Sequence, residues 1–139
     1  MIKTALIADN DLLFVEFFGD LLEQRGYRVF KAFDGLEALE NLQQIAIDLF
    51  FVDIYMPKMD GREVIRRAKE GHSHDEMKII AISGADRQTL EGLDELECDA
   101  FLQKSPLEQM STDLDFLIDS LGQSKVQSPT SKVDGMNAE

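Results

Sequence analysis

The chain has 139 residues, a formal net charge of −13, 44% hydrophobic residues and a single cysteine, Cys98. This length predicts one domain whose core needs no disulfide or structural metal, and one cysteine excludes an intrachain disulfide. The acidic balance argues against direct binding of nucleic acid, which needs clustered Lys and Arg. No stretch reaches the roughly 20 apolar residues of a membrane span, and the N-terminus does not resemble a secretory signal. We therefore expect a reduced, cytoplasmic setting and no membrane partner.

Short apolar runs alternate with segments of helical periodicity along the chain. In chain order the sequence predicts a strand at 4–8, a helix at 12–25, a strand at 27–32, a helix at 36–44, a strand at 48–53 and a helix at 62–69. A strand at 77–82, a helix at 87–97, a strand at 99–103 and a final helix at 105–121 follow. Gly26 and Gly71 indicate helix stops. Strands that alternate with helices predict an α/β fold with a doubly wound parallel sheet.

The last helix has a clear start signal and a predicted stop. Ser105 is the expected N-cap, Pro106 occupies the first helical position and Glu108 completes a capping box. Gly122 is expected just past the end of this helix. Residues 123–139 are polar and lack periodicity, so we expect a domain over 1–122 followed by a disordered tail. Such a tail is too short to be an output domain.

Polar residues of particular kinds stand where the predicted strands end. Asp9 follows the first strand, Asp53 ends the third, Ser83 follows the fourth and Lys104 follows the fifth. In an open α/β sheet, ligands bind in the crevice beyond the carboxyl ends of the strands. Two carboxylates, a hydroxyl and an ammonium at this edge suit a small anionic group that is held beside a divalent cation.

Residues 2–121 resemble a response-regulator receiver domain of two-component signalling, in particular a stand-alone, chemotaxis-regulator-like receiver. The resemblance rests on Asp9, on the segment Asp48–Asp53 with Met56-Pro57 and Asp60-Gly61, on Ser83-Gly84-Ala85 and on Phe101–Lys104. It implies a flavodoxin-like fold of five parallel strands in the order 2-1-3-4-5 with five helices. It also implies a phosphoacceptor signalling domain rather than an enzyme, capable at most of self-phosphorylation from small donors and of autodephosphorylation.

The resemblance also implies a role for each site residue. Asp53 would accept a phosphoryl group from a phosphohistidine, on a histidine kinase or a histidine phosphotransfer protein. Ser83 and Lys104 would bind phosphoryl oxygens, and Phe101 would be an aromatic switch. Mg²⁺ would be the cofactor, with ligands from Asp9, Asn10, Asp53 and the backbone carbonyl of Tyr55. The chemistry agrees, because a carboxylate attacks an anionic phosphoryl group poorly unless a cation offsets the charge.

Three residues depart from the family's usual pattern. Asn10 stands where a second acid is usual, which removes one negative charge from the metal site. Asp11 follows, and two interpretations stay open for it, a compensating metal ligand or the N-cap of the first helix. Ser105 separates Lys104 from Pro106, where the family usually has Lys-Pro with a cis bond. Phe101 replaces a frequent tyrosine and lacks its hydroxyl.

The leading hypothesis is a single-domain response regulator. Phosphorylation would switch the surface formed by the segments 87–97, 99–103 and 105–121, which would bind an unknown downstream protein or form a weak dimer of an otherwise monomeric chain. The alternative is a degenerate receiver that acts as a phosphorylation-independent interaction module because of Asn10. Tyr55 counts against an aspartyl-phosphate hydrolase, which would need a second Asp there. Asp9, Asn10 and Asp11 count against flavin binding, which would need a phosphate loop.

Overall fold

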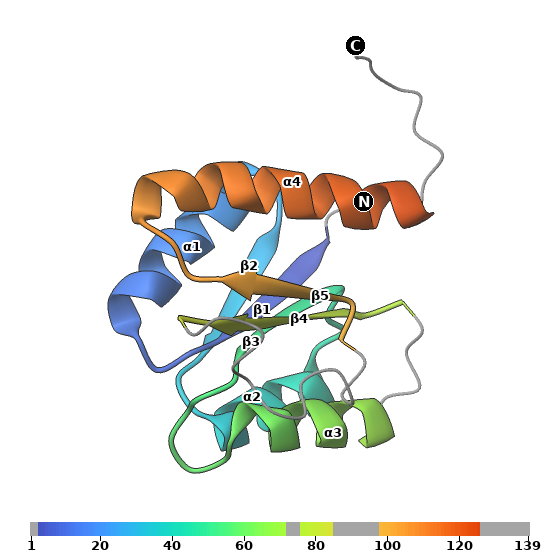
Figure 1. Cartoon of the computed structure of the whole chain (residues 1–139). Coiled ribbons are helices and arrows are strands. Elements are labelled where there is room, and N and C mark those ends of the chain that lie inside the picture. Colours follow the sequence, from blue (N-terminus) through green and yellow to red (C-terminus); the bar gives the residue numbers. More distant parts are fainter. Residues whose placement is uncertain (1–2, 72–75, 85–97, 126–139) are drawn as a thin grey trace. The chain divides into compact units, whose positions relative to one another are not determined.

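A computed structural model provides the structure, which describes residues 3–71, 76–84 and 98–125. Its elements, shown in Figure 1, are β1 (Thr4–Ala8), α1 (Leu12–Gln24), β2 (Arg28–Ala32), α2 (Gly35–Gln44), β3 (Leu49–Asp53), α3 (Gly61–Gly71), β4 (Lys78–Ser83), β5 (Ala100–Gln103) and α4 (Leu107–Lys125). All five predicted strands form, and within the described residues the ends of the elements up to β5 match the predictions or differ from them by at most two residues. The helix expected at 87–97 lies outside the described residues.

The strands form one parallel sheet in the order β2-β1-β3-β4-β5, as the resemblance to receiver domains implied. The register pairs Ala8 with Val52, Asp53 with Ile82, and Ser83 with Gln103. The carboxyl ends of β1, β3, β4 and β5 are therefore nearly level with one another. This alignment collects whatever side chains follow those four strands at one edge of the sheet.

The strands are covered on both faces, which explains why they are apolar along their length. One face packs against α2 and α3 and the other carries α1 (Figure 1). The core between the sheet and the α2–α3 pair is made of buried apolar side chains that include Leu6, Phe50, Val52, Leu42 and Val64. Because side chains alternate along a strand, Phe51 points to the other face, where its ring meets the edge of Phe18 from α1 at 5.0 Å between centroids.

Two glycines are required by the local backbone. Gly26 has φ of +91°, and the bonds from Gly26 N to Glu23 O and from Tyr27 N to Leu22 O close a Schellman motif. It ends α1 as predicted, because glycine adopts the left-handed conformation without steric cost. Gly61 is needed for a different reason: a Cβ atom there would lie 2.1 Å from the backbone oxygen of Asp53. The start of α3 therefore packs directly against the end of β3.

We predict that Gly61→Ala destabilises the fold strongly, because the added methyl group meets backbone atoms that cannot rotate away. Overpacking of this kind costs about 1–3 kcal/mol or more. Gly71→Ala is the matched control, since nothing lies within 4 Å of a Cβ atom at that position. Urea unfolding of both variants provides the measurement. Equal midpoints for the two variants would contradict the close approach of α3 to β3.

Helix α4 continues past its predicted end. It begins at Leu107 and runs to Lys125, so Gly122 lies inside the helix instead of following it. Glycine is a weak terminator when it keeps a helical φ, at a cost of about 1 kcal/mol relative to alanine, and the first proline after Gly122 is Pro129. The predicted boundary at 122 therefore falls within α4, and residues 126–139 of the expected tail lie outside the described residues. Met110, Leu114 and Leu117 are buried at helical spacing, whereas Phe116 is exposed.

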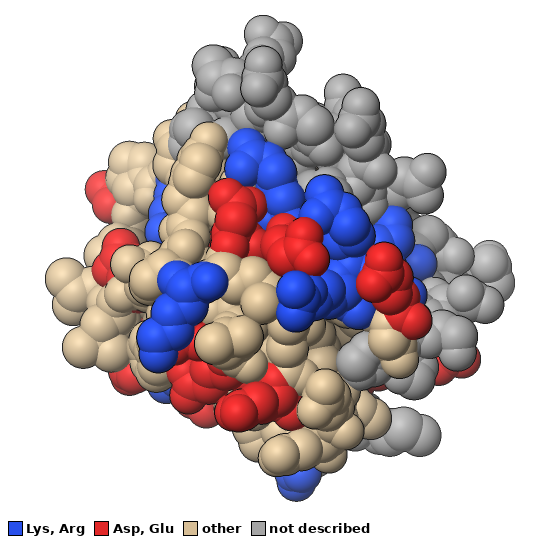
Figure 2. All heavy atoms as spheres, turned by 90° about the horizontal axis from the view of Figure 1, so that it is seen from below, with Lys and Arg blue, Asp and Glu red and all other residues tan. Residues whose placement is uncertain are grey.

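The basic run on α3 is a solvated face with internal ion pairs. Arg62 pairs with Asp60, and both Arg66 and Arg67 pair with Glu63. Figure 2, which views the molecule from below, shows basic and acidic side chains interleaved on this face. Such pairing leaves no purely cationic stripe for a nucleic-acid backbone. None of the described helices is long and apolar enough to cross a membrane.

Candidate functional site

Two carboxylates lie side by side at the carboxyl edge of the central strands. Asp9 follows β1, and since Ala8 pairs with Val52, Asp9 is level with Asp53 at the end of β3. Both residues are buried, at 0% and 6% exposure. Their positions are fixed by backbone bonds that continue the sheet beyond the strands, from Asp9 N to Ala32 O and from Ile54 N to Ile82 O, both 3.0 Å. Two like charges that are buried side by side are costly unless a cation lies close to them.

The electrostatics of Asp53 reflect that cost. Burial and the neighbouring carboxylate of Asp9 raise the pKa of Asp53 from 3.8 to about 7. The ammonium of Lys104 and the backbone N–H of Tyr55, which donates to Asp53 Oδ1 at 3.3 Å, act in the opposite direction. Raised pKa values of carboxyl groups in clusters of this kind are a common mark of functional sites. Any additional positive charge placed beside Asp53 would therefore stabilise its ionised form.

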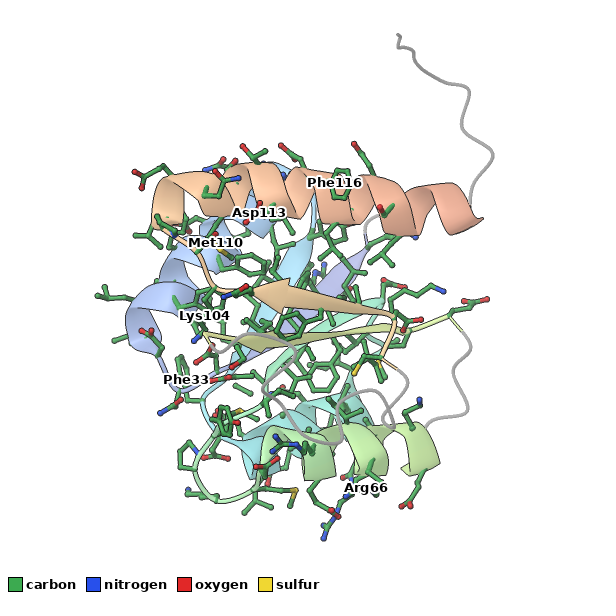
Figure 3. All side chains as sticks on the ribbon, in the orientation of Figure 1. Phe33, Arg66, Lys104, Met110, Asp113 and Phe116 are labelled. Carbon is green, nitrogen blue, oxygen red and sulfur yellow. The ribbon has the colours of Figure 1, made fainter. Side chains whose placement is uncertain are left out.

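Lys104 supplies one positive charge to both carboxylates. Its Nζ lies 2.8 Å from Asp9 Oδ2 and 3.9 Å from Asp53 Oδ2. The residue stands beyond the end of β5 (Figure 3) and is held there by a bond of 2.8 Å from its backbone N–H to Ser83 O. Within the described residues Asp9 Oδ2 nonetheless receives no hydrogen bond of regular geometry. A buried carboxylate oxygen in this state has a lone pair left for a cation.

Ser83 is the last residue of β4 and is almost fully buried, at 1% exposure. It lies one position beyond Ile82, the partner of Asp53 in the sheet. The register thus brings Ser83 to the edge where Asp9, Asp53 and Lys104 meet, as the sequence predicted. The four side chains come from four different strands, and only the sheet topology brings them together.

The two residues after Asp9 differ in what they do. Asp11 is the N-cap of α1, where its Oδ1 accepts from Phe14 N at 3.2 Å, and its own backbone N–H donates to Asp9 Oδ1 at 2.9 Å. The capping interpretation of Asp11 is therefore confirmed. Asn10 lies exposed between the two acids. Among the described residues, no group of three or more His, Cys, Asp or Glu side chains is placed so that it could hold a metal ion.

The loop between β3 and α3 is tied to the start of α2. Lys58 has φ of +70°, an uncommon value for a residue other than glycine, and its ammonium pairs with Asp34 at 3.3 Å. Asp34 also caps α2 by accepting from Glu37 N at 2.8 Å, and this backbone bond, with Lys58, lowers the pKa of Asp34. These contacts fix the loop that carries Tyr55, whose side chain is exposed beneath the guanidinium of Arg62. Sequence reasoning missed the pairing of Asp34 with Lys58, which is a long-range contact.

Phe101 and Phe14 are two aromatic residues that lie on opposite faces of the sheet. Phe101, on β5, is half-buried and packs against the core between the sheet and the α2–α3 pair. Phe14, on α1, is buried at 5% exposure, and its ring also lies under the ammonium of Lys104, with Nζ 4.6 Å from the ring centroid. The sequence signal for this contact was weak, since it consists only of an aromatic residue one turn after the helix cap. Each peptide bond within the described residues is trans, including the bond from Lys104 to Ser105.

The comparison with protein families identifies the class. The sequence model of the response regulator receiver domain matches residues 5–114, and the chain belongs to this family. Receiver domains act in two-component signalling and are signalling domains rather than classical enzymes. They bind Mg²⁺ for phosphorylation and interact with histidine kinases or phosphotransfer proteins. The sequence-based prediction of the family is therefore confirmed.

Two relatives show how far the similarity extends. The chain is 34% identical over 115 residues to the response regulator GtcR of Aneurinibacillus migulanus, a match that covers 80% of this chain but 46% of GtcR. It is 30% identical over 105 residues to the polar-differentiation response regulator DivK of Brucella ovis, covering 75% of this chain and 85% of DivK. The chain thus spans less than half the length of GtcR and most of the length of DivK.

Solved structures agree on the fold. A CheY-like receiver domain of Methanospirillum hungatei superposes with a TM-score of 0.74 at 24% identity, covering 89% of this chain and 99% of that one. The response regulator TrrA of Thermotoga maritima, solved in complex with Mg²⁺-BeF, gives a TM-score of 0.69 at 25% identity, covering 84% of this chain and 99% of TrrA. The predicted flavodoxin-like receiver fold is confirmed.

Proposed function

We propose that this receiver domain accepts a phosphoryl group on Asp53 from a phosphohistidine of a histidine kinase or a phosphotransfer protein. The observation that carries the proposal is the buried pair of Asp53 and Asp9, with the ammonium of Lys104 within 4 Å of both carboxylates. This set of groups provides a nucleophile together with part of the positive charge that its reaction requires.

The side chains have distinct tasks in the transfer. Asp53 Oδ1 is engaged by Tyr55 N–H, so Oδ2, which faces Lys104, is the oxygen that attacks phosphorus. A P–O bond to Asp53 forms as the P–N bond of the phosphohistidine breaks, and the electron pair of that bond stays on the imidazole nitrogen. Lys104 exchanges its contact with Asp9 for a phosphoryl oxygen, and the Ser83 hydroxyl donates to another. The product is an acyl phosphate on Asp53.

The residues present fit a magnesium ion. Asp9 Oδ2 is buried and lacks a regular hydrogen bond within the described residues, and Mg²⁺ prefers carboxylate and carbonyl oxygens together with water. Asp9, Asp53 and the carbonyl of Tyr55 would hold the ion, with the amide oxygen of Asn10 as a neutral ligand. When bound, the ion offsets negative charge on the phosphoryl group as it is transferred. Asp11 is a weaker candidate ligand, because its Oδ1 already caps α1.

We expect Asn10→Asp to bind Mg²⁺ more tightly than the wild type, because an added carboxylate increases the attraction of the site for a dication. Isothermal titration with Mg²⁺ at fixed ionic strength is the measurement. Gln43→Glu, which adds one negative charge at an exposed position of α2, is the control for the change in net charge. An unchanged or weaker affinity in Asn10→Asp would show that the geometry at position 10 does not reach the ion.

The direct test of the function is labelling by a small donor. The full chain is incubated with acetyl phosphate and Mg²⁺, and its intact mass is recorded over time. A gain of one phosphoryl group that disappears on hydroxylamine treatment indicates an acyl phosphate. No gain in mass at any donor concentration would sink the proposal.

One observation favours a second candidate function. Asn10 removes a charge from the metal site, and no third acid joins Asp9 and Asp53 among the described residues. A receiver with weak metal affinity would act as an interaction module that does not depend on phosphorylation. The labelling experiment separates the two functions, since only the first gives an acyl phosphate.

We further propose that phosphorylation changes the surface around β5. Phosphate on Asp53 gives the buried hydroxyl of Ser83 a strong acceptor, and the small residue Gly84 lets the backbone after it move. Phe101 is already partly packed against the core, and without a hydroxyl it loses little by turning further inward. A difference of a few kcal/mol between two states suffices to shift the population. Downstream binding or weak dimerisation would use the surface of residues 87–121.

We expect beryllofluoride with Mg²⁺, as a phosphoryl mimic, to change hydrogen exchange within residues 84–106. The physical reason is that this segment follows Ser83 and includes Phe101. Mass spectrometry of peptides from the full chain gives the readout, and Asp53→Asn with the same reagents is the control. Changes confined to α1 or α2 would place the output surface elsewhere.

A further inference from the structure

We propose that Phe14 is a positioning residue for the phosphoryl-binding ammonium. The ring of Phe14 contacts the ammonium of Lys104 and keeps it in position while its anionic partner changes from Asp9 to a phosphoryl oxygen. The inference rests on the proposed function, because it concerns the step in which Lys104 leaves Asp9 for a phosphoryl oxygen.

The ammonium of Lys104 has three neighbours, two carboxylates and one aromatic ring. Nζ lies 2.8 Å from Asp9 Oδ2, 3.9 Å from Asp53 Oδ2 and 4.6 Å from the centroid of the Phe14 ring. A cation at this distance from an aromatic face is attracted by the ring quadrupole, most strongly where water is partly excluded. The Lys104 side chain is 23% exposed and Phe14 only 5%. The contact is therefore shielded from solvent on the side of the ring.

The ring is itself fixed by a chain of aromatic contacts. Phe14 stacks on Phe18, with centroids 5.0 Å apart and planes at 15°, and Phe18 meets Phe51 edge-on at 5.0 Å. Phe51 lies two positions before Asp53 on β3. The backbone of Phe14 is held as well, since its N–H donates to Asp11, the N-cap of α1. Phe14, which contacts Lys104, is thus linked by packed aromatic rings to the strand that carries Asp53.

The uncharged ring of Phe14 affects Lys104 differently from a carboxylate partner. During transfer, the ammonium must loosen its contact with Asp9 and turn to a new anion. A carboxylate that held Lys104 tightly would oppose this change, whereas the ring attracts the ammonium with either partner. Phe14 therefore limits the positions that Lys104 occupies without competing for its new bond. Removing the ring leaves a long, flexible side chain to find the phosphoryl oxygen by itself.

The first test is kinetic. Phe14→Leu, which keeps an apolar side chain, is expected to lower the rate of labelling by acetyl phosphate about three- to tenfold, the effect of losing a partly shielded cation–π contact. Phe17→Leu, a half-buried phenylalanine on the same helix, is the matched control and should retain the wild-type rate. In a Lys104→Met background, Phe14→Leu should have no further effect, because the ring acts through the ammonium. An equal loss in both backgrounds would reduce Phe14 to a packing residue and overturn the proposal.

The second test needs no phosphorylation. In the metal-free protein, the Lys104 methylene protons next to Nζ should be shifted upfield in the NMR spectrum by the Phe14 ring, and the shift should vanish in Phe14→Leu but not in Phe17→Leu. Random-coil values in the wild type would overturn the contact. If the wild type shows this shift and is not labelled at all, the proposed function and the positioning role fall together. If the wild type and Phe14→Leu are labelled at equal rates, only the positioning role of Phe14 is overturned and the proposed function stands.

Discussion

Asp53→Asn is expected to abolish labelling by acetyl phosphate, while Asp20→Asn, the same change at an exposed position of α1, leaves it intact. The amide keeps the shape of the side chain but is a far weaker nucleophile, and it removes one of the two buried negative charges. Asp9 stays in place, so residual labelling that hydroxylamine removes measures how well a neighbouring carboxylate substitutes for Asp53. Intact mass followed by peptide mapping is the measurement.

This variant also decides between two acceptors at the same edge. Ser83 lies one position beyond the partner of Asp53 in the sheet, and a phosphoserine would survive hydroxylamine, whereas an acyl phosphate would not. A hydroxylamine-stable phosphoryl group in Asp53→Asn would reassign the acceptor to a hydroxyl group. Undiminished, hydroxylamine-sensitive labelling would point to Asp9 instead.

Most of the sheet could be predicted from sequence, because each buried strand is a short apolar run that ends in a polar residue. Leu49–Asp53 is the clearest case, since all of its residues are buried. The meeting of Asp9, Asp53 and Lys104 followed from the rule that carboxyl ends of parallel strands share an edge. No pairwise signal in the sequence was needed, because the topology itself brings these side chains together.

The features that were missed depend on contacts rather than on local pattern. Gly122 was expected to end the last helix, but its position alone could not show that the backbone keeps a helical φ through it. The pairing of Lys58 with Asp34 joins two loops far apart in sequence. Phe14 looked like any other apolar residue on the buried side of a helix, and its second contact, with Lys104, became visible only once β5 was placed.

In the absence of metal, we expect the contribution of Asp53 to the stability of the wild type to fall as the pH rises from about 4 to about 7. The native pKa of Asp53 is raised from 3.8 to about 7 by burial and by Asp9. In this window the native state therefore binds more protons than the unfolded state, and the free energy of unfolding decreases with pH. The loss is complete above the native pKa and amounts to a few kcal/mol at most, on the order of 1.4 kcal/mol per pKa unit.

Asp53→Asn should lack this fall, because the amide carries no charge at any pH. Urea midpoints of the two proteins in EDTA should coincide near pH 4 and diverge by pH 8, with the variant more stable. Taking the difference between them removes the contributions of surface acids such as Asp34 and Glu63, whose pKa values are lowered and whose stabilisation is lost toward acid pH. Parallel curves over the whole range would contradict a buried, destabilised carboxylate at position 53.

Mg²⁺ should reduce the difference in stability between the two proteins by stabilising the wild type. A ligand that binds only the native state adds about 2.7 kcal/mol at a concentration of 100 Kd, and it requires ionised carboxylates, so the gain should grow as the pH rises through 7. Asp53→Asn, which has lost one ligand, should gain much less. The charge that weakens the metal-free fold is then the same charge that attracts the cation, and the ionised Asp53 that results is the form that the proposed phosphoryl transfer requires.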